Sequence, residues 1–277
     1  MHLYAFDTDG GPVVVVTDDD GLLPEAESAA AAAPLGRALP GPVVAGDAAK
    51  QAVERGRPLA PLRPGKIVAV GLNYLDHVEE AGTEAPARPL LFAKFPSSVI
   101  GPDAEIVVDR RVTERVDWEV ELGVVIGRTL RDVPAGDALG HVFGYTAGND
   151  VSARDVQFGD GQWVRGKSLD TFCPLGPRIV TADAIPDPQR LRLTTKVNGE
   201  VVQDSSTAKM IFDVAEILAF CSRSFTLEPG DLVLTGTPWG CGEFMDPKRS
   251  LRDGDVVEVS VEGVGALRNP VREVHAG

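Results

Sequence analysis

Short apolar runs, separated by turn residues at intervals of roughly ten, dominate the chain from Lys66 onward. They predict strands at 67–70, 90–95, 120–126, 232–234, 256–261 and 264–273, and a hairpin at 196–202 with an Asn-Gly turn. One helix is expected after Ser206 or Thr207, because apolar residues from Met210 to Cys221 recur at helical spacing. Strands outnumber helices, which favours an α+β or mainly β domain with a rolled sheet.

The first 65 residues have a different pattern and predict a small α+β module. The expected elements are strands at Leu3–Phe6 and Val13–Thr17 and helices at 25–33 and 47–55. A proline-dense connector, 57–65, cannot continue a helix. We therefore divide the chain into an N-terminal module, 1–65, and a larger domain, 66–277.

The segment Val116–Leu122 places an acidic residue at every second position. Alternate side chains of a strand point to the same face, so Asp117, Glu119 and Glu121 would share one face. The run continues apolar to Gly127, which indicates that the strand enters a core, where ionised carboxylates are costly unless paired or bound to a metal. Oxygen ligands favour a hard cation, Mg²⁺ above all, or Mn²⁺ or Ca²⁺. A strand with a solvated acidic face is the alternative.

Composition narrows the classes of partner. The 277 residues are 43% hydrophobic and 25% charged, as in ordinary soluble globular proteins, and the formal net charge is −14. This charge argues against nucleic acid and membranes as partners, and it allows a small anionic substrate only where cations are concentrated locally. The three widely spaced cysteines suit a reducing compartment. With neither a leader pattern nor a long apolar run, we expect a cytoplasmic protein.

His77 and Glu80 lie three residues apart in a segment that predicts a short helix, with Asn73 as its cap and Gly82 as its stop. The two side chains would share a face of that helix. A carboxylate beside an imidazole fixes its tautomer and raises its basicity, as a general base requires. An exposed helix with ordinary polar residues is the alternative.

Two later segments add candidate polar groups. Asp150 follows a short strand-like run, and a helical turn would align Arg154 and Gln157 with it. Lys167 stands between small residues, where it could approach an anionic ligand closely. A loop lysine in water is the simpler interpretation of Lys167 taken alone.

A glycine-rich run at 234–242 follows a predicted strand. It lacks the Gly-Lys-Ser/Thr ending of a P-loop, so we do not expect nucleotide binding. Its backbone amides and Thr237 could still hold a carboxylate.

Taken together, these motifs resemble the fumarylacetoacetate hydrolase family. They follow the family's order along 66–277: Gly71…Asn73-Tyr74…His77…Glu80, Phe92-Ala93-Lys94…Pro96-Ser97-Ser98, Asp117-Trp118-Glu119-Val120-Glu121-Leu122, Gly144-Tyr145…Asn149-Asp150-Val151-Ser152-Ala153-Arg154-Asp155, Gly166-Lys167-Ser168…Asp170-Thr171, Val197-Asn198-Gly199-Glu200 and Gly236-Thr237-Pro238…Gly240…Gly242. Leu169 and Cys241 depart from the pattern, at positions where the family often has an aromatic residue and valine.

The resemblance implies a mixed β-roll, like the family's C-terminal domain, with a divalent metal that is usually Mg²⁺, or else Mn²⁺ or Ca²⁺. By position the metal ligands would be Glu119, Glu121 and Asp150. His77 with Glu80 resembles the dyad that activates water, and Lys167 resembles the active-site lysine. The substrate-orienting groups would be Lys94, Arg154, Gln157 and Thr237.

Family substrates are mostly 2-oxo acids or 1,3-dicarbonyl acids, cleaved or rearranged through a metal-stabilised enolate. We expect hydrolysis of a C–C bond in a 2,4-dioxo acid such as an acylpyruvate, because the intact His77/Glu80 pair can activate water. Decarboxylation of an oxaloacetate-like acid and isomerisation or hydration of a dienoate are alternatives within the family. A non-catalytic acidic metal-binding protein is an alternative outside it. Homodimers are common in the family, and we expect one here.

Overall fold

The computed structural model describes residues 1–274, whose strands form one sheet of twelve strands, one of five and one of two. The twelve-stranded sheet contains β1 (His2–Thr8), β2 (Gly11–Asp18), β3 (Gly21–Leu22), β4 (Val43–Val44), β5 (Arg57–Leu59), β6 (Ile67–Gly71), β7 (Leu90–Lys94), β8 (Val99–Ile100), β11 (Val120–Ile126), β12 (Val142–Asn149), β14 (Cys173–Thr181) and β17 (Leu232–Leu234). The five-stranded sheet contains β9 (Ile106–Asp109), β15 (Arg192–Val197), β16 (Glu200–Ser206), β18 (Val256–Val261) and β19 (Gly265–Val274), and the pair is β10 (Val116–Asp117) with β13 (Ser152–Ala153). The α+β, mainly β architecture is as predicted.

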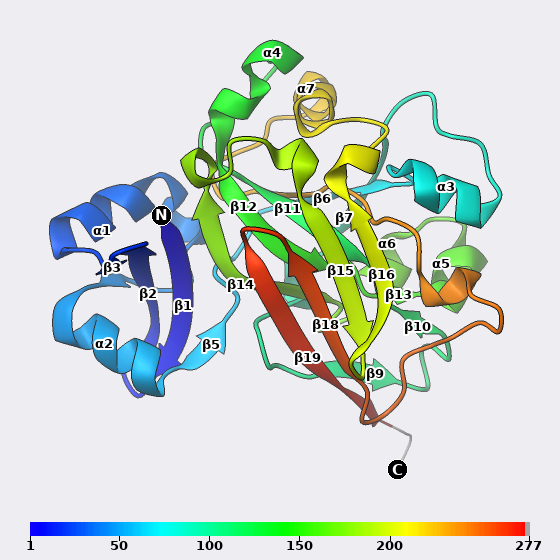
Figure 1. The fold of residues 1–277 in the computed structure, drawn as a ribbon, viewed down its shortest axis with the longest axis horizontal. Coiled ribbons are helices and arrows are strands. Elements are labelled where there is room, and N and C mark those ends of the chain that lie inside the picture. The colour runs from blue at the N-terminus through cyan, green and yellow to red at the C-terminus, as the bar shows by residue number, and fades with distance from the viewer. Residues whose placement is uncertain (275–277) are drawn as a thin grey trace.

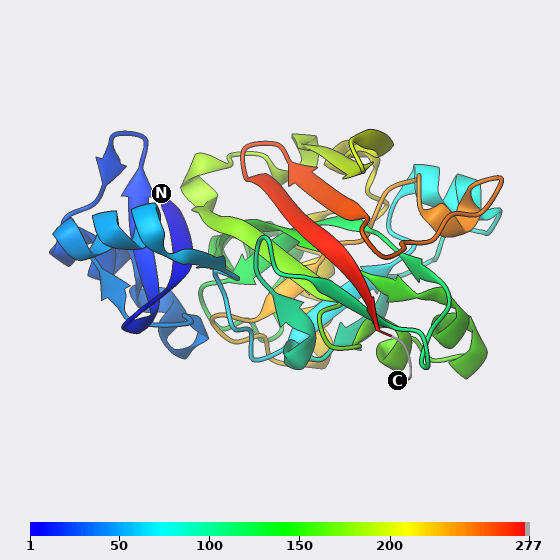
Figure 2. The same cartoon turned by 90° about the horizontal axis from the view of Figure 1, so that it is seen from below.

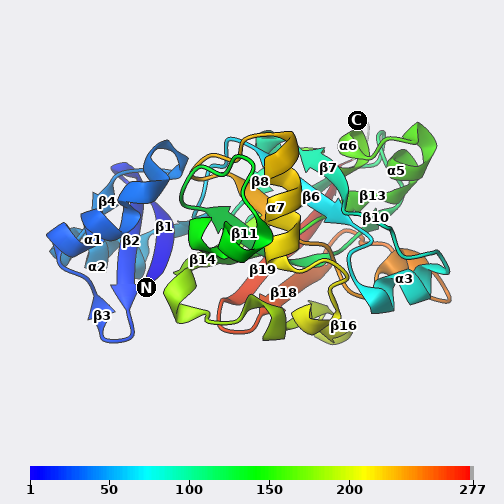
Figure 3. The same ribbon diagram turned by 90° about the horizontal axis from the view of Figure 1, so that it is seen from above.

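Seven α-helices accompany the sheets within residues 1–274. They are α1 (Glu25–Ala32), α2 (Gly46–Arg55), α3 (Leu75–Ala81), α4 (Ala135–Ala138), α5 (Arg154–Asp160), α6 (Val164–Lys167) and α7 (Val214–Ser224). None of these helices has the length and apolar character needed to cross a lipid bilayer. In Figure 3 the molecule is seen from the side on which α7 lies.

The N-terminal elements gather at one end of the molecule, and α3, α5 and α6 lie at the other end (Figures 1 and 2). The twelve-stranded sheet nevertheless connects the N-terminal elements to the rest of the molecule. Its strand β1 pairs antiparallel with β14, with His2 opposite Val180. The division at residue 65 stays a prediction. The last three residues of the predicted larger domain lie outside the described residues.

The two faces of β11 enter different cores, which explains why the whole strand is apolar apart from Glu121. Leu122 and Val124 belong to the core that also contains Val259 of the five-stranded sheet. Val125, on the other face, packs in the core that also contains Leu3. Burial of each such side chain stabilises the fold by about 1.5–3 kcal/mol, so β11 is held from both sides.

The predicted unbroken strand from Val116 into the core is wrong. The chain leaves β10 at Asp117 and enters β11 at Val120, because the pairing partner changes from β13 to β12. Trp118 and Glu119 lie in the break and are buried. The alternative of a solvated acidic face is also wrong, since Asp117, Glu119 and Glu121 are all buried.

The predicted start of α7 is wrong as well. Ser206 caps only a short 3₁₀ turn, accepting a hydrogen bond from the Ala208 amide at 3.2 Å. The helix begins after Asp213, which forms a capping box with Glu216. Met210 is held outside the helix by a bridge to Tyr74. Tertiary pairing therefore overrides the helical spacing of the apolar residues before Asp213.

Asn73 does not cap α3, contrary to the prediction. Its amide nitrogen donates to the carbonyls of Phe212 at 3.1 Å and Thr235 at 2.8 Å, and its oxygen accepts from the Phe212 amide at 2.9 Å. This buried side chain ties the start of α3 to two distant segments. The predicted end of α3 is right, because Gly82 has the left-handed conformation, with φ 62°, that glycine adopts readily.

Candidate active site

Three buried carboxylates lie together where β11 begins and β12 ends. The two strands are antiparallel with Val120 opposite Asn149, so Glu119 and Glu121 lie beside Asp150. Each of these three residues, which we call the acidic cluster, offers a carboxylate oxygen within 4.8 Å of the other two. The backbone fixes the arrangement, since the Asp150 amide donates to the Glu119 carbonyl at 2.9 Å. The residues that the family resemblance names as metal ligands are thus brought together.

Buried cations compensate two members of the acidic cluster. Lys167 Nζ donates to Glu119 Oε2 and Asp150 Oδ2, both at 2.7 Å. Lys94 Nζ donates to Asp150 Oδ1 at 2.6 Å, and Arg154 Nη2 lies 2.6 Å from Glu119 Oε1. Burial opposes ionisation of Glu119, but the charges of Lys167 and Arg154 outweigh it and lower the pKa to about 2. Glu119 is therefore ionised.

Glu121 is the member with the weakest compensation. Its Oε2 accepts from the Gly236 amide at 2.7 Å, and no ion pair to Glu121 is found within residues 1–274. Burial and the charges of Asp150 and Glu119 raise its pKa well above the usual value. A cation among the three carboxylates would relieve this repulsion. Since all the donors are oxygens, the acidic cluster fits a hard divalent cation.

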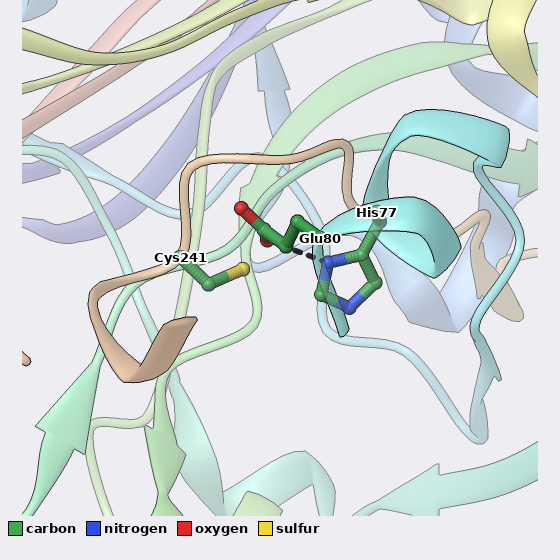
Figure 4. Close-up of side chains that lie close together, drawn as sticks. All are labelled: His77, Glu80 and Cys241. Atoms are coloured by element: carbon green, nitrogen blue, oxygen red, sulfur yellow. Dashed lines mark hydrogen bonds and ion pairs between the residues drawn. The ribbon is translucent and has the colours of Figure 1, made fainter. Parts of the chain in front are cut away.

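His77 and Glu80 form a second feature of the site (Figure 4). His77 Nδ1 lies 2.9 Å from Glu80 Oε1, and Glu80 Oε2 accepts from the Gly240 amide at 2.7 Å. The imidazole is buried, 6% exposed, and packs edge-on against Phe244 with ring centres 5.4 Å apart. The alternative of an exposed helix is therefore wrong for this face of α3. The predicted proximity of His77 and Glu80 is found.

The glycine-rich loop after β17 holds carboxylates of the protein itself. Three of its amides donate to three acidic side chains at 2.7–2.8 Å: Gly236 to Glu121, Gly240 to Glu80 and Gly242 to Asp117. Position 240 requires glycine, because a Cβ there would lie 2.1 Å from the Val202 carbonyl oxygen and the backbone φ is 96°. These amides are already engaged, so the loop positions the acidic groups of the site.

A cavity of about 220 Å³ lies against these groups. Six of the predicted site residues line it, namely His77, Glu119, Arg154, Gln157, Lys167 and Thr237. Its apolar wall includes the aromatic residues Phe92, Phe158, Trp163 and Phe244. A larger cavity of about 650 Å³ lies elsewhere, between segments 57–64 and 96–104, and none of the predicted site residues lines it. Volume alone does not identify an active site. We therefore place the site at the smaller cavity, which predicted site residues line.

Lys94 is not among the residues that line the cavity. Besides Asp150, its ammonium group donates to the carbonyls of Val151, at 3.4 Å, and Lys167. Lys94 thus compensates the negative charge of the Asp150 carboxylate. Its contact with a substrate stays a prediction.

Arg154 and Gln157 lie on one face of α5, where Arg154 Nη1 donates to Gln157 Oε1 at 3.1 Å. The helical turn does not include Asp150, contrary to the prediction, because β13 separates them. Arg154 is instead fixed by Asp117, whose Oδ2 accepts from Nε at 2.9 Å. Asp117 therefore orients Arg154 and lies outside the acidic cluster.

Sequence reasoning gave no role to two buried amide side chains. Asn149 Oδ1 accepts from the Glu119 amide at 3.0 Å and so fixes the break between β10 and β11. Gln203 accepts from the Val120 amide and donates to Thr237 Oγ1, both at 3.0 Å. The polar Asn149 at the end of an apolar run was a usable signal. Nothing in the pattern of β16 distinguishes Gln203.

Comparison with known proteins finds a family profile and several proteins that this chain resembles. The profile described as "Fumarylacetoacetate (FAA) hydrolase C-terminal" matches residues 66–272. The human protein "Oxaloacetate tautomerase FAHD2A, mitochondrial" is 47% identical over 216 residues, 77% of this chain and 68% of its own length. An uncharacterised protein of Archaeoglobus fulgidus is 50% identical over 211 residues, 76% of this chain and 80% of its own length. The human relative is named as mitochondrial, and the cytoplasmic location stays a prediction here.

Two solved structures match almost the whole chain. The fumarylacetoacetate hydrolase from the psychrophile Exiguobacterium antarcticum has a TM-score of 0.83 at 38% identity, and the match covers 99% of this chain and 100% of that one. The 5-carboxymethyl-2-hydroxymuconate delta-isomerase from Mycobacterium smegmatis has a TM-score of 0.81 at 39% identity, with the same coverage. These three relatives are named as a tautomerase, a hydrolase and an isomerase.

Proposed function

The chain belongs to the fumarylacetoacetate hydrolase family and is an enzyme of that family, and from this we propose that it interconverts the keto and enol forms of a small 2-oxo dicarboxylic acid such as oxaloacetate. The observation that carries the proposal is the acidic cluster and its cations beside a cavity of about 220 Å³. The name of the human relative, an oxaloacetate tautomerase at 47% identity, supports it. A divalent cation held by Glu119, Glu121 and Asp150, most simply Mg²⁺ or Mn²⁺, would polarise the keto oxygen of the acid.

Cations on the cavity wall favour an acid substrate in this acidic protein. Arg154 and Lys167 both line the cavity, and Gln157 lies beside Arg154. These groups can hold the carboxylates of a diacid by charge and hydrogen bonding. The cavity volume of about 220 Å³ is below the roughly 300–1,000 Å³ that is usual for drug-sized ligands. A small acid therefore suits it better than a nucleotide.

Two groups of the chain are placed to handle the proton. With Nδ1–H donating to Glu80, the imidazole of His77 keeps a lone pair on Nε2 that can take a proton from the carbon next to the keto group. Burial opposes the charge of Lys167, but Asp150 and Glu119 outweigh it and raise its pKa. Lys167 therefore remains an ammonium group, stabilises the negative charge that develops on the substrate oxygen and can give that oxygen the proton that completes the enol. Proton exchange with solvent then restores both His77 and Lys167.

Hydrolysis of an acylpyruvate is the second candidate, and the His77–Glu80 pair favours it. Glu80 is fixed on both oxygens, by His77 and by the Gly240 amide. An imidazole held in this way can also take a proton from water. Water attack on the distal carbonyl of a 2,4-dioxo acid would then break the C–C bond, and the leaving carbon would accept a proton.

One set of assays separates these reactions. With Mg²⁺ or Mn²⁺ present, we expect faster loss of the enol absorbance of oxaloacetate, without matching formation of pyruvate, and little loss of acylpyruvate absorbance. Cleavage of acylpyruvates without faster tautomerisation would instead establish the hydrolase. Pyruvate formed from oxaloacetate as fast as the enol disappears would establish decarboxylation. A protein inactive on every one of these acids would contradict the proposal.

A further inference from the structure

A second group of potential metal ligands lies where α3 faces the loop after β17 (Figure 4). His77, Glu80 and Cys241 each offer a ligand atom, and these atoms lie within 4.8 Å of one another. The group offers a nitrogen, an oxygen and a sulfur, whereas the acidic cluster offers oxygen alone. Nitrogen and sulfur ligands are typical of Zn²⁺, and sets of oxygen ligands are typical of Mg²⁺. The two groups therefore suit different metals.

We propose that His77, Glu80 and Cys241 form a binding site for Zn²⁺, and that zinc bound there inhibits the enzyme. Bonds of about 2.0–2.3 Å place the ligand atoms of tetrahedral zinc about 3.3–3.8 Å apart. His77 Nδ1 and Glu80 Oε1 are 2.9 Å apart, so they must separate slightly. The ligand atoms of the three residues lie within 4.8 Å of one another, so the sulfur has to approach by no more than roughly 1.5 Å. Water can supply the fourth ligand.

The environment of Cys241 favours a cation over redox chemistry. Burial, with the charges of Asp117 and Glu119, raises the pKa of the thiol well above its usual value. A protonated, fully buried thiol is a poor nucleophile and reacts slowly with oxidants. Glu80, whose charge also raises the pKa of this thiol, belongs to the group itself and could bind the cation directly. On binding, the sulfur gives up its proton to water, and the neutral imidazole, coordinating through Nδ1, carries its proton on Nε2.

Zinc at this position would disable the proposed proton transfer. Coordination through Nδ1 replaces the hydrogen bond to Glu80 and leaves Nε2 protonated, so His77 has no lone pair for a substrate proton. Both ligands on α3 would also be tied to the loop after β17. Inhibition should therefore appear even when Mg²⁺ saturates the acidic cluster.

The test uses Co²⁺ as a spectroscopic probe in the full chain with Mg²⁺ in excess. Wild type should develop thiolate-to-cobalt charge-transfer absorption that saturates with added Co²⁺. Cys241→Val and Cys241→Ser should lack that absorption. Cys221→Ala is the matched control, because Cys221 is a buried cysteine of α7 and is not part of the group. It should behave as wild type.

Zinc inhibition supplies a second readout, expressed relative to the rate of each variant without zinc. The Cys241 variants should need at least about tenfold more Zn²⁺ for half-inhibition, since loss of a ligand costs at least as much as loss of an outer contact. Wild type without the cobalt absorption, or Cys241 variants as sensitive to zinc as wild type, would overturn the proposal. The absorption does not require turnover, so it remains decisive if the tautomerase proposal fails.

Discussion

His77 contacts Glu80 and Phe244 and also lines the cavity, so its removal tests the proposed proton transfer directly. We expect His77→Ala to lower kcat by about 10²–10⁴, the usual contribution of general acid–base catalysis. Affinity for Mg²⁺ or Mn²⁺ should barely change, because His77 is not in the acidic cluster. Glu79→Gln, an exposed carboxylate on the same helix, is the control. A fall in metal affinity as large as the fall in rate would instead make His77 a metal ligand.

Glu121 offers a test that does not depend on knowing the substrate. Added Mn²⁺ or Mg²⁺ should raise the thermal midpoint of the wild type, because a cation that binds only the folded state stabilises it. Glu121→Gln should abolish that rise and the metal-dependent activity together. Without metal, the variant should unfold no earlier than the wild type, since it removes a buried carboxylate that Asp150 and Glu119 repel. An undiminished metal-induced rise in Glu121→Gln would exclude Glu121 as a ligand.

Residues close together in sequence were the easiest to predict. The spacing of His77 and Glu80 is sufficient to pair them on a helix. Asp117 was misplaced, because alternation holds only within an unbroken strand and the chain changes partner after Asp117. The hydrogen-bond partners of Lys94 could not be predicted from the sequence, because its ammonium group lies beside Asp150 only once β7 and β12 have joined the same sheet.

Among the elements, strands were predicted better than helix boundaries. The Asn-Gly hairpin appears as expected, with Asn198 and Gly199 at φ 54° and 84°, because that turn is encoded locally. The start of α7 depends on a competition between Ser206 and Asp213. Local residues permit either cap, and the bridge between Tyr74 and Met210 decides the outcome.

This competition can be measured by removing each cap in turn. Asp213→Ala should lower the free energy of unfolding by about 1 kcal/mol, within the usual 0.5–2 kcal/mol for a lost N-cap. Ser206→Ala, the matched control, should cost less, because Ser206 caps only the 3₁₀ turn at 207–209. Denaturant unfolding of both variants provides the comparison. A larger loss in Ser206→Ala would mean that α7 depends on the earlier cap.

At the scale of the whole molecule, residues 1–65 share a hydrophobic core with the rest of the chain. One core contains Leu3 and Leu62 from this part together with Leu175 and Leu232 from the rest. The β1–β14 pairing and the hydrogen bond from the Met1 amino group to Thr181 also cross between the parts. Shared apolar burial of this kind favours a single cooperative unit. The expected homodimer stays a separate prediction, to be checked by the molar mass in solution.

Denaturant unfolding can be followed separately in the two parts, because all three tryptophans, Trp118, Trp163 and Trp239, lie after residue 65. We expect the backbone amides of β1 and β2 to lose hydrogen-exchange protection at the same denaturant concentration at which tryptophan fluorescence changes. The reason is that opening the N-terminal part would expose Leu175 and Leu232 together with Leu3. Protection that disappears from β1 and β2 well before the fluorescence changes would show an independent module, as the predicted boundary at residue 65 implies.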